Sequence, residues 1–318
     1  MGSNITRLAL LFAGVVFAAA ISWSKPRSRQ RFVLCAALLA VTGWQVGHTV
    51  GDQLRTSAAA SWNHDQLEPL LNQLQQLDAA RARVEVVPPA SHRESSAIAL
   101  RYNLARGWNR QADGERNPLF YDGTLTPESY RSWLERWAVR YVVLPRHDRL
   151  DPAATKEAKI VESGQPYLKE IWTNTHWKLY AVEDPVPLAE KPAMIKSATA
   201  AELTVIMPSA GTVLLRIPYS PWLALIDRED VSLPAHNDST PPNSCLMKAP
   251  RDRAGDEWTY LHASAAGEYH IAAPYQLPRG TPCPQAAQTK VDFYIRRTNA
   301  TGVSSQPSTV STDFSLSG

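Results

Sequence analysis

The sequence predicts a membrane-anchored α+β protein in which a two-helix transmembrane hairpin is followed by a small α/β domain and an antiparallel β-sandwich. Almost all of the long apolar sequence in this 318-residue chain lies before residue 51. Helical and strand patterns then alternate up to a proline-rich segment that starts at Pro185, and only short β-type runs follow it. The expected divisions are a hairpin over residues 1–51, an α/β domain over 52–185, a β-sandwich over 186–283 and a mostly disordered tail over 284–318.

Two apolar runs form the expected hairpin, Leu8–Trp23 and Phe32–Val50. As helices they would extend roughly 24 Å and 28 Å, close to the ~30 Å hydrocarbon core of a bilayer. The N-terminal tail has a single arginine, whereas the segment between the runs carries Lys25, Arg27, Arg29 and Arg31. By the positive-inside rule we expect this segment in the cytoplasm. The N-terminus and everything after residue 51 would then lie outside the cell membrane.

A cleaved signal peptide is the alternative for the first run, because Phe17-Ala18-Ala19-Ala20 resembles a small-residue cleavage site. One membrane anchor would then remain. The bulk of the chain would still be extracytoplasmic.

The three cysteines fit an extracytoplasmic placement. Cys35 lies inside the second apolar run, and Cys245 and Cys283 both lie in the outer region. A disulfide between Cys245 and Cys283 is expected in an oxidising compartment. Two separate thiols remain the alternative, because a sequence does not give the distance between two Cα atoms.

Helix and strand signals alternate between residues 65 and 182. Leucines recur at helical spacing from Asp65, and Thr126-Pro127-Glu128 is typical of a capped helix start. The expected order is a helix from 65, a strand at 83–87, a long loop over 88–125, a helix from 127, a strand at 141–144, a helix over 151–162, and strands at 167–172 and 177–182.

Beyond Pro192 the helical signal ends, and short runs of β-forming residues are separated by turn-rich segments. This spacing is typical of a β-sandwich. The expected strands cover residues 203–207, 212–218, 222–227, 258–263 and 269–273. From about residue 284 the composition turns to Ser, Thr and Gln, which favours disorder.

Charge and motifs exclude several classes of function. With 33 basic and 30 acidic residues, the net charge of +3 is too small for a nucleic-acid binder that works by its overall field. Three cysteines are too few for a four-cysteine zinc site. The sequence contains no phosphate-binding loop, dinucleotide fingerprint, His-Glu-x-x-His or Gly-x-Ser-x-Gly motif. We therefore expect no cofactor, no metal, no nucleic acid and no assignable catalytic residue.

The expected long loop carries the first candidate binding site. Arginine suits phosphate, and aromatic rings suit sugar faces. The functional interpretation is one wall of a sugar-phosphate or lipid-phosphate site. The alternative is a surface loop whose arginines pair with Asp113, Glu115 and Asp122. The candidate residues are Arg101, Arg106, Trp108, Arg110 and Tyr121.

Two weaker candidates lie elsewhere. His92 and Glu94 form a His-x-Glu pair, but the Pro-Cys-x-x-Cys partner of a zinc deaminase is missing, so only a general base is retained. Trp222 lies in the expected sandwich. An exposed tryptophan there would bind carbohydrate, and core packing is the alternative.

Several segments together resemble a known group of membrane proteins. The segments are RVEVVP, ARGWNRQ, NPLFYDGTLTPESYRSWL, AVRYVVLP and GQPYLKEIWTNTHWKLYAV, all between residues 83 and 183. Over roughly residues 52–280 the chain resembles the extracytoplasmic C-terminal region of actinobacterial polytopic membrane proteins. These are related to GT-C glycosyltransferases, which use polyprenyl-phosphate sugars, and to YfhO-like and PTPS-related proteins.

The resemblance implies a role in envelope glycan assembly, with one departure. Such enzymes have about ten spans and an acidic catalytic residue in the first outer loop, whereas the expected inter-helix loop here is basic. The family's catalytic residue therefore has no counterpart. We expect a non-catalytic C-terminal module that assists acceptor or partner binding. Its expected partners are the bilayer, a polyprenyl-phosphate sugar or envelope glycan, and a polytopic protein with the catalytic spans. The alternatives are a complete enzyme using residues 88–125 and a ligand-free structural membrane protein.

Overall fold

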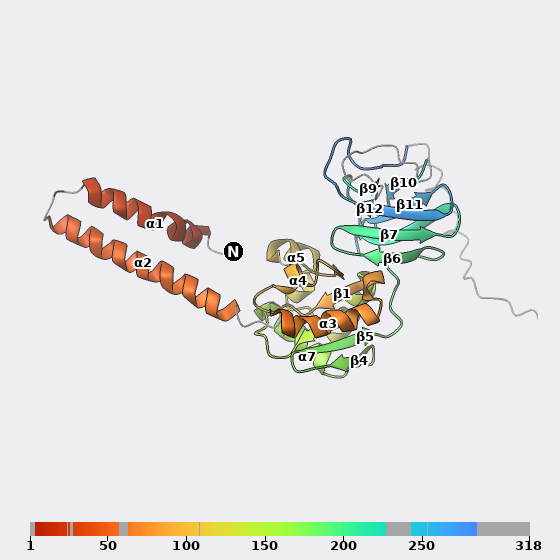
Figure 1. Cartoon of the computed structure of the whole chain (residues 1–318), viewed down its shortest axis with the longest axis horizontal. Coiled ribbons are helices and arrows are strands. Elements are labelled where there is room, and N and C mark those ends of the chain that lie inside the picture. Colours follow the sequence, from red (N-terminus) through yellow and green to blue (C-terminus); the bar gives the residue numbers. More distant parts are fainter. Residues whose placement is uncertain are drawn as a thin grey trace, which may run out of the picture. The chain divides into compact units, whose positions relative to one another are not determined.

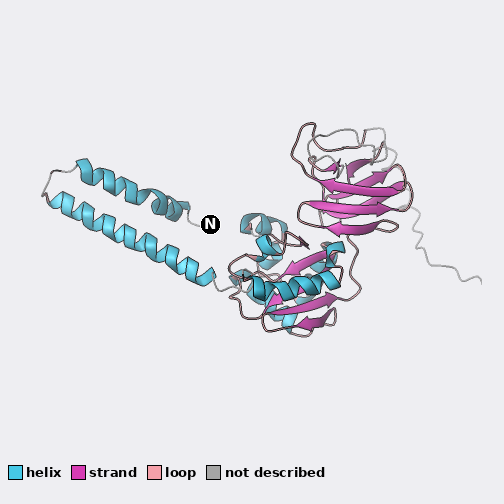
Figure 2. Ribbon diagram, in the orientation of Figure 1, coloured by secondary structure: helices cyan, strands magenta, loops and turns pink. Residues whose placement is uncertain are grey.

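The computed structural model describes residues 4–23, 25, 28–56, 63–107, 109–226, 243–252 and 254–284. It confirms the α+β class: N-terminal helices, a mixed five-stranded sheet with helices, and then antiparallel sheets (Figure 2). The expected disordered tail lies outside the described residues, apart from Pro284. Two compact units form the chain, Met1–Ala79 with Val84–Pro185, and Ala80–Arg83 with Val186–Gly318.

The N-terminal segment contains two helices that run side by side, α1 (Asn4–Trp23) and α2 (Arg29–Thr56) (Figure 1). Within α2, the stretch Arg29–Gly51 is apolar and long enough to cross a membrane, and none of it is buried by the rest of the chain. The described apolar part of α1, Phe12–Trp23, is shorter than a span. The expectation of two spans is thus corrected to one, because only α2 combines sufficient length with sufficient apolarity in the described part of the chain.

The first unit is built on a five-stranded sheet in the order β2-β1-β3-β5-β4. Strand β3 pairs antiparallel with β5, and β5 with β4. The strands are β1 (Arg83–Val86), β2 (Asn103–Leu104), β3 (Val139–Pro145), β4 (Leu168–Thr173) and β5 (Trp177–Val182). The helices are α3 (His64–Gln76), α4 (Glu94–Ala97), α5 (Arg110–Arg116), α6 (Pro127–Arg136) and α7 (Thr155–Glu162).

Local sequence explains where these helices begin and what they bury. The Thr126 hydroxyl accepts a hydrogen bond from the Ser129 backbone N–H, and Ser129 bonds back to the Thr126 N–H, which completes a capping box before α6. The leucines of α3 are buried, as their helical spacing predicts. Trp177 of β5 is fully buried, and its indole N–H donates to the Gln66 carbonyl, which ties α3 to the sheet.

The second unit contains two antiparallel sheets, β10-β11-β8 and β6-β7-β12-β9. Buried and less buried residues alternate along β8 and β12, as expected for strands with one covered face. The strands are β6 (Met194–Ala198), β7 (Glu202–Met207), β8 (Gly211–Pro218), β9 (Ala224–Ile226), β10 (Cys245–Lys248), β11 (Trp258–Ala263) and β12 (Gly267–Ala272).

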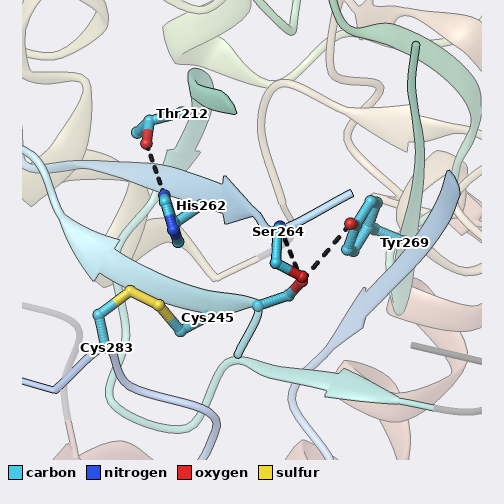
Figure 3. Close-up of a disulfide and its surroundings, with 7 residues drawn as sticks. Thr212, Cys245, His262, Ser264, Tyr269 and Cys283 are labelled. Carbon is cyan, nitrogen blue, oxygen red and sulfur yellow. Dashed lines mark hydrogen bonds between the residues drawn. A yellow bond between two sulfur atoms is a disulfide. The ribbon is translucent and has the colours of Figure 1, made fainter. Parts of the chain in front are cut away.

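A disulfide between Cys245 and Cys283 closes the second unit (Figure 3). The segment that carries Cys283 runs beside β10, where the Leu246 N–H donates to the Thr281 carbonyl and the Cys283 N–H donates to the Leu246 carbonyl. Buried Met247 packs in the same cluster as the two cysteines. The bond therefore fastens the last described residues to β10.

Candidate functional site

Residues 88–125 are not the continuous loop that the sequence indicated. They contain α4, β2 and α5, together with a short 3₁₀ turn at Pro118–Phe120. Asn109 begins α5 by accepting hydrogen bonds from the Gln111 and Ala112 backbone N–H groups. These short elements fix the direction of each candidate side chain.

Arg106 lies at the centre of a buried charge cluster. Its guanidinium Nη1 is 2.8 Å from Glu157 Oε2 and 3.8 Å from Glu85 Oε1. Its Nε is 3.3 Å from Asp113 Oδ2, an ion pair without hydrogen-bond geometry. The ring of Phe120 covers the guanidinium, with Cζ 3.8 Å from the ring centroid. We call these five residues the Arg106 cluster.

Neutral donors form hydrogen bonds with two carboxylates of the cluster. Glu157 accepts from the Tyr130 hydroxyl at 3.0 Å. Asp113 accepts from the Tyr121 hydroxyl at 2.6 Å and from the Asn117 amide at 2.8 Å. Each carboxylate that faces Arg106 at close range is therefore also held by an uncharged donor, which offsets part of its desolvation cost.

The cluster holds three carboxyl groups around one guanidinium, so the single cation faces more carboxyl groups than it can neutralise. Burial and the neighbouring Glu157 raise the pKa of Glu85 well above its usual range. Burial also raises the pKa of Glu157. Glu85 is therefore the carboxyl of the cluster that stays protonated and neutral. Burial acts to lower the pKa of Arg106, but the surrounding carboxylates outweigh it and raise that pKa, so the guanidinium stays charged.

This geometry fixes the chemical role of Arg106. Its donors face buried carboxylates from β1, α5 and α7, and its side chain is 4% exposed. No open guanidinium face remains for a phosphate. The arrangement is that of a structural ion cluster, which holds the short elements of 88–125 against the sheet and α7.

The other candidates of this segment lie in different environments. Arg101 is exposed. Arg110 is 58% exposed, with its Nη1 3.9 Å from Asp151 Oδ2 and its Cζ 5.6 Å from the Tyr121 ring centroid. Burial and its bond to Asp113 raise the pKa of Tyr121. Trp108 lies outside the described residues. Arg101 and Arg110 are thus the described arginines among these candidates that face solvent.

His92 joins two loops of the first unit through its imidazole. Its Nδ1 is 3.4 Å from Glu94 Oε1, and its Nε2 is 3.4 Å from Asp151 Oδ2. Its backbone φ of 50° lies in the left-handed region, which is uncommon for a residue other than glycine. The Ala90 N–H donates to the Arg149 carbonyl, so backbone contacts join the same two loops.

Both ring nitrogens of His92 face carboxylates, and this decides its chemistry. A general base needs one ring nitrogen directed at its substrate. Here the close contact with Glu94 raises the pKa of His92, burial opposes this, and the charge of Asp151 raises the pKa further. The geometry therefore favours a charged imidazolium that joins the two loops through ion pairs with Glu94 and Asp151. Within the described residues, no group of His, Cys, Asp and Glu has an arrangement that could hold a metal ion.

A pH titration tests the role of His92. Because its folded pKa is raised above the usual 6.5, its contribution to stability is fully present below pH 6.5 and is lost as the pH rises through the raised value. We expect the unfolding midpoint of the wild type to fall more between pH 6 and pH 9 than that of His92→Asn, since asparagine tolerates the left-handed backbone. Melting temperatures that depend on pH in the same way in the wild type and in His92→Asn would contradict this stabilising role of His92.

Trp222 lies in a turn before β9 in the second unit and is half-buried. Its ring centroid is 5.7 Å from that of Tyr275, and the Arg279 guanidinium carbon lies 4.7 Å from the Trp222 ring centroid. Trp222 is therefore neither a fully buried core residue nor a free aromatic face. Trp222 was predicted from the sequence as a candidate, whereas Tyr275 and Arg279 were not. More than 50 residues separate Tyr275 and Arg279 from Trp222 along the chain.

One family model matches this chain, over residues 190–288. Its description is "Domain of unknown function (DUF8823)". The matched region includes Trp222 and both cysteines of the disulfide, whereas the Arg106 cluster and His92 lie outside it. No curated protein matches the chain, and no solved structure matches it.

Proposed function

We propose that the chain is a membrane-anchored extracytoplasmic module that assists acceptor or partner binding in cell-envelope glycan assembly, without catalysing sugar transfer on its own. In this proposal it acts as the C-terminal part of a GT-C-like glycosyltransferase system. A polytopic protein supplies the catalytic spans.

The observation that carries the proposal is the exposed membrane-length helix and the charge at its N-terminal end. Lys25, Arg27, Arg29 and Arg31 precede or begin the stretch Arg29–Gly51. By the positive-inside rule that end lies in the cytoplasm, and the five-stranded sheet and the second unit, which follow α2 in the chain, lie outside. This orientation depends on α2 alone and does not require α1 to span the membrane.

The disulfide independently supports the same side of the membrane. Cys245 and Cys283 are bonded, and stable disulfides are typical of extracytoplasmic proteins. Cys35, in α2, is the remaining cysteine and is free. A thiol in the apolar helix and a disulfide in the second unit agree with one anchor and an outer domain.

The proposal takes the two antiparallel sheets of the second unit as layers of a β-sandwich. Tyr269 of β12 is fully buried, and its hydroxyl lies 3.4 Å from the hydroxyl of Ser244, the residue before β10 (Figure 3). A contact between a strand of one sheet and a residue next to a strand of the other is what a shared core requires.

Sugar-phosphate binding is assigned to the solvent-facing arginines Arg101 and Arg110. The test uses the full chain in nanodiscs with and without polyprenyl-phosphate-linked sugar. We expect Arg101→Gln/Arg110→Gln to lose binding, while Arg131→Gln keeps it. Arg131 is an exposed residue of α6 that pairs with Glu135 and lies over the Tyr167 ring, and it is not part of the proposed site. Equal binding by both variants would contradict this assignment. Sugar transfer by the purified chain alone would contradict the non-catalytic role.

A further inference from the structure

The loop between β12 and Cys283 carries an unusual concentration of exposed apolar surface. Outside α1 and α2, the described residues include four large hydrophobic side chains that are exposed: Leu100, Met194, Tyr275 and Leu277. Two of the four lie within three residues of each other. Tyr275 is 73% exposed and Leu277 is 76% exposed. We call residues 274–279, all of which are exposed, the 274–279 loop.

Several contacts anchor the chain directly after this loop. Gly280 has a φ of 57°, and a Cβ at this position would collide with the carbonyl oxygens of Pro221 and Leu223. The Thr281 N–H donates to the Leu223 carbonyl, and its hydroxyl accepts from the Leu225 N–H. The disulfide at Cys283 follows directly. The exposed side chains therefore project from an anchored base.

The composition of the loop matches a lipid–water interface. It contains Tyr275, Leu277, two prolines, Gln276 and Arg279, and no acidic residue. Tyrosine and tryptophan are enriched at headgroup level, and an arginine next to them interacts with lipid phosphates. Arg279 lies over the Trp222 ring, so the cation and the aromatic residues form one surface.

A carbohydrate fits this surface less well. A sugar needs an open aromatic face and several hydrogen-bonding groups around it. Arg279 already covers one face of Trp222, and the most exposed side chain, Leu277, offers no polar atom. The tether to a spanning helix also keeps the second unit at high effective concentration near the bilayer.

We propose that the 274–279 loop, together with Trp222, docks onto the surface of the membrane in which α2 is anchored, inserting Tyr275 and Leu277 at headgroup level with Arg279 on lipid phosphate. This inference rests on the proposed function, because it requires the second unit to lie on the side of a membrane to which α2 is anchored. It adds a second, reversible membrane contact and a constraint on the orientation of the second unit.

A fluorescent probe within the loop tests the proposal in the full chain. In a Cys35→Ser background, Gln276→Cys is labelled with an environment-sensitive dye and reconstituted into phosphatidylglycerol nanodiscs. We expect emission at shorter wavelength than in detergent, and quenching by brominated lipid. The matched control is Met194→Cys on β6, an exposed apolar position of the same unit, whose label should stay water-like. Adding Tyr275→Ser/Leu277→Ser to the Gln276→Cys chain should remove the lipid response.

The outcomes separate this inference from the proposed function. Failure of the full chain to float with lipid would contradict the anchor itself. Stable flotation with a Gln276→Cys label that aqueous iodide quenches and brominated lipid does not would overturn the docking loop alone. A label that responds to soluble envelope glycan fragments in detergent, and not to lipid, would also overturn it in favour of a sugar site.

Discussion

Replacing Arg106 with methionine should destabilise the first unit by about 3–5 kcal/mol, because it leaves buried carboxylates without their cation. Methionine preserves apolar contact with Phe120, so the loss reports the charge rather than a cavity. Denaturant titration with hydrogen exchange as the readout measures this loss of stability. The amides of α6, β3 and α7 report on the unit that contains the cluster. Arg131→Met is the control, since this exposed arginine forms a helix pair worth about 0.3–0.5 kcal/mol.

Two further measurements distinguish a charge effect from lost packing. Adding Asp113→Asn and Glu157→Gln to Arg106→Met should recover part of the stability, because the carboxyl that then remains in the cluster is Glu85, whose raised pKa keeps it neutral. Without the guanidinium, the folded protein binds protons more tightly, so the deficit of Arg106→Met should shrink as the pH falls towards 4.5. An Arg106→Met protein as stable as Arg131→Met at neutral pH would contradict the structural role of the cluster.

Removing the disulfide should cost the second unit about 3–4 kcal/mol. The two cysteines are 38 residues apart, so the bond restricts the conformations of the unfolded chain. Removing the bond raises the entropy of the unfolded state and thereby lowers the stability of the folded unit. Cys245→Ala/Cys283→Ala should melt at a lower temperature than the wild type. Reductant should lower the melting temperature of the wild type and leave that of the double variant unchanged.

Cys35→Ala is the matched control for the disulfide, because Cys35 is an unpaired, exposed cysteine in α2. Its melting temperature should equal that of the wild type, with or without reductant. If mass spectrometry finds Cys245 and Cys283 reduced in the wild type treated with reductant while its melting temperature is unchanged, the disulfide does not stabilise this unit.

Local signals were sufficient to predict much of the fold. Thr126-Pro127 marks the start of α6, the leucine spacing marks α3, and the β-type runs mark most strands of the second unit. Strand β6 was missed because lysine and serine interrupt its apolar residues. Strand β10 was missed because its apolar run is only three residues long and ends at Lys248. The first apolar run was predicted as a span on its residue count, whereas the described apolar part of α1 is shorter.

Long-range pairing explains why the candidate site was predicted only in part. The alternative in which an arginine pairs with Asp113 describes one contact of Arg106, but its other partners lie on β1 and α7. A pattern read along the chain does not bring residues 51 positions apart together. One signal was present in the sequence: Glu85 is a charged residue between the apolar residues Val84 and Val86 of a strand, which indicates a buried partner.

Thiol labelling on intact cells tests the central claim, the placement of the five-stranded sheet and of the second unit outside the membrane. Single cysteines replace exposed residues of a Cys35→Ser chain: Leu100 in the first unit, Met194 in the second and Gln30 at the N-terminal end of α2. A membrane-impermeant maleimide should label Leu100→Cys and Met194→Cys in intact cells, and Gln30→Cys only after lysis. Labelling of Gln30→Cys in intact cells, with Leu100→Cys and Met194→Cys protected until lysis, would contradict the account.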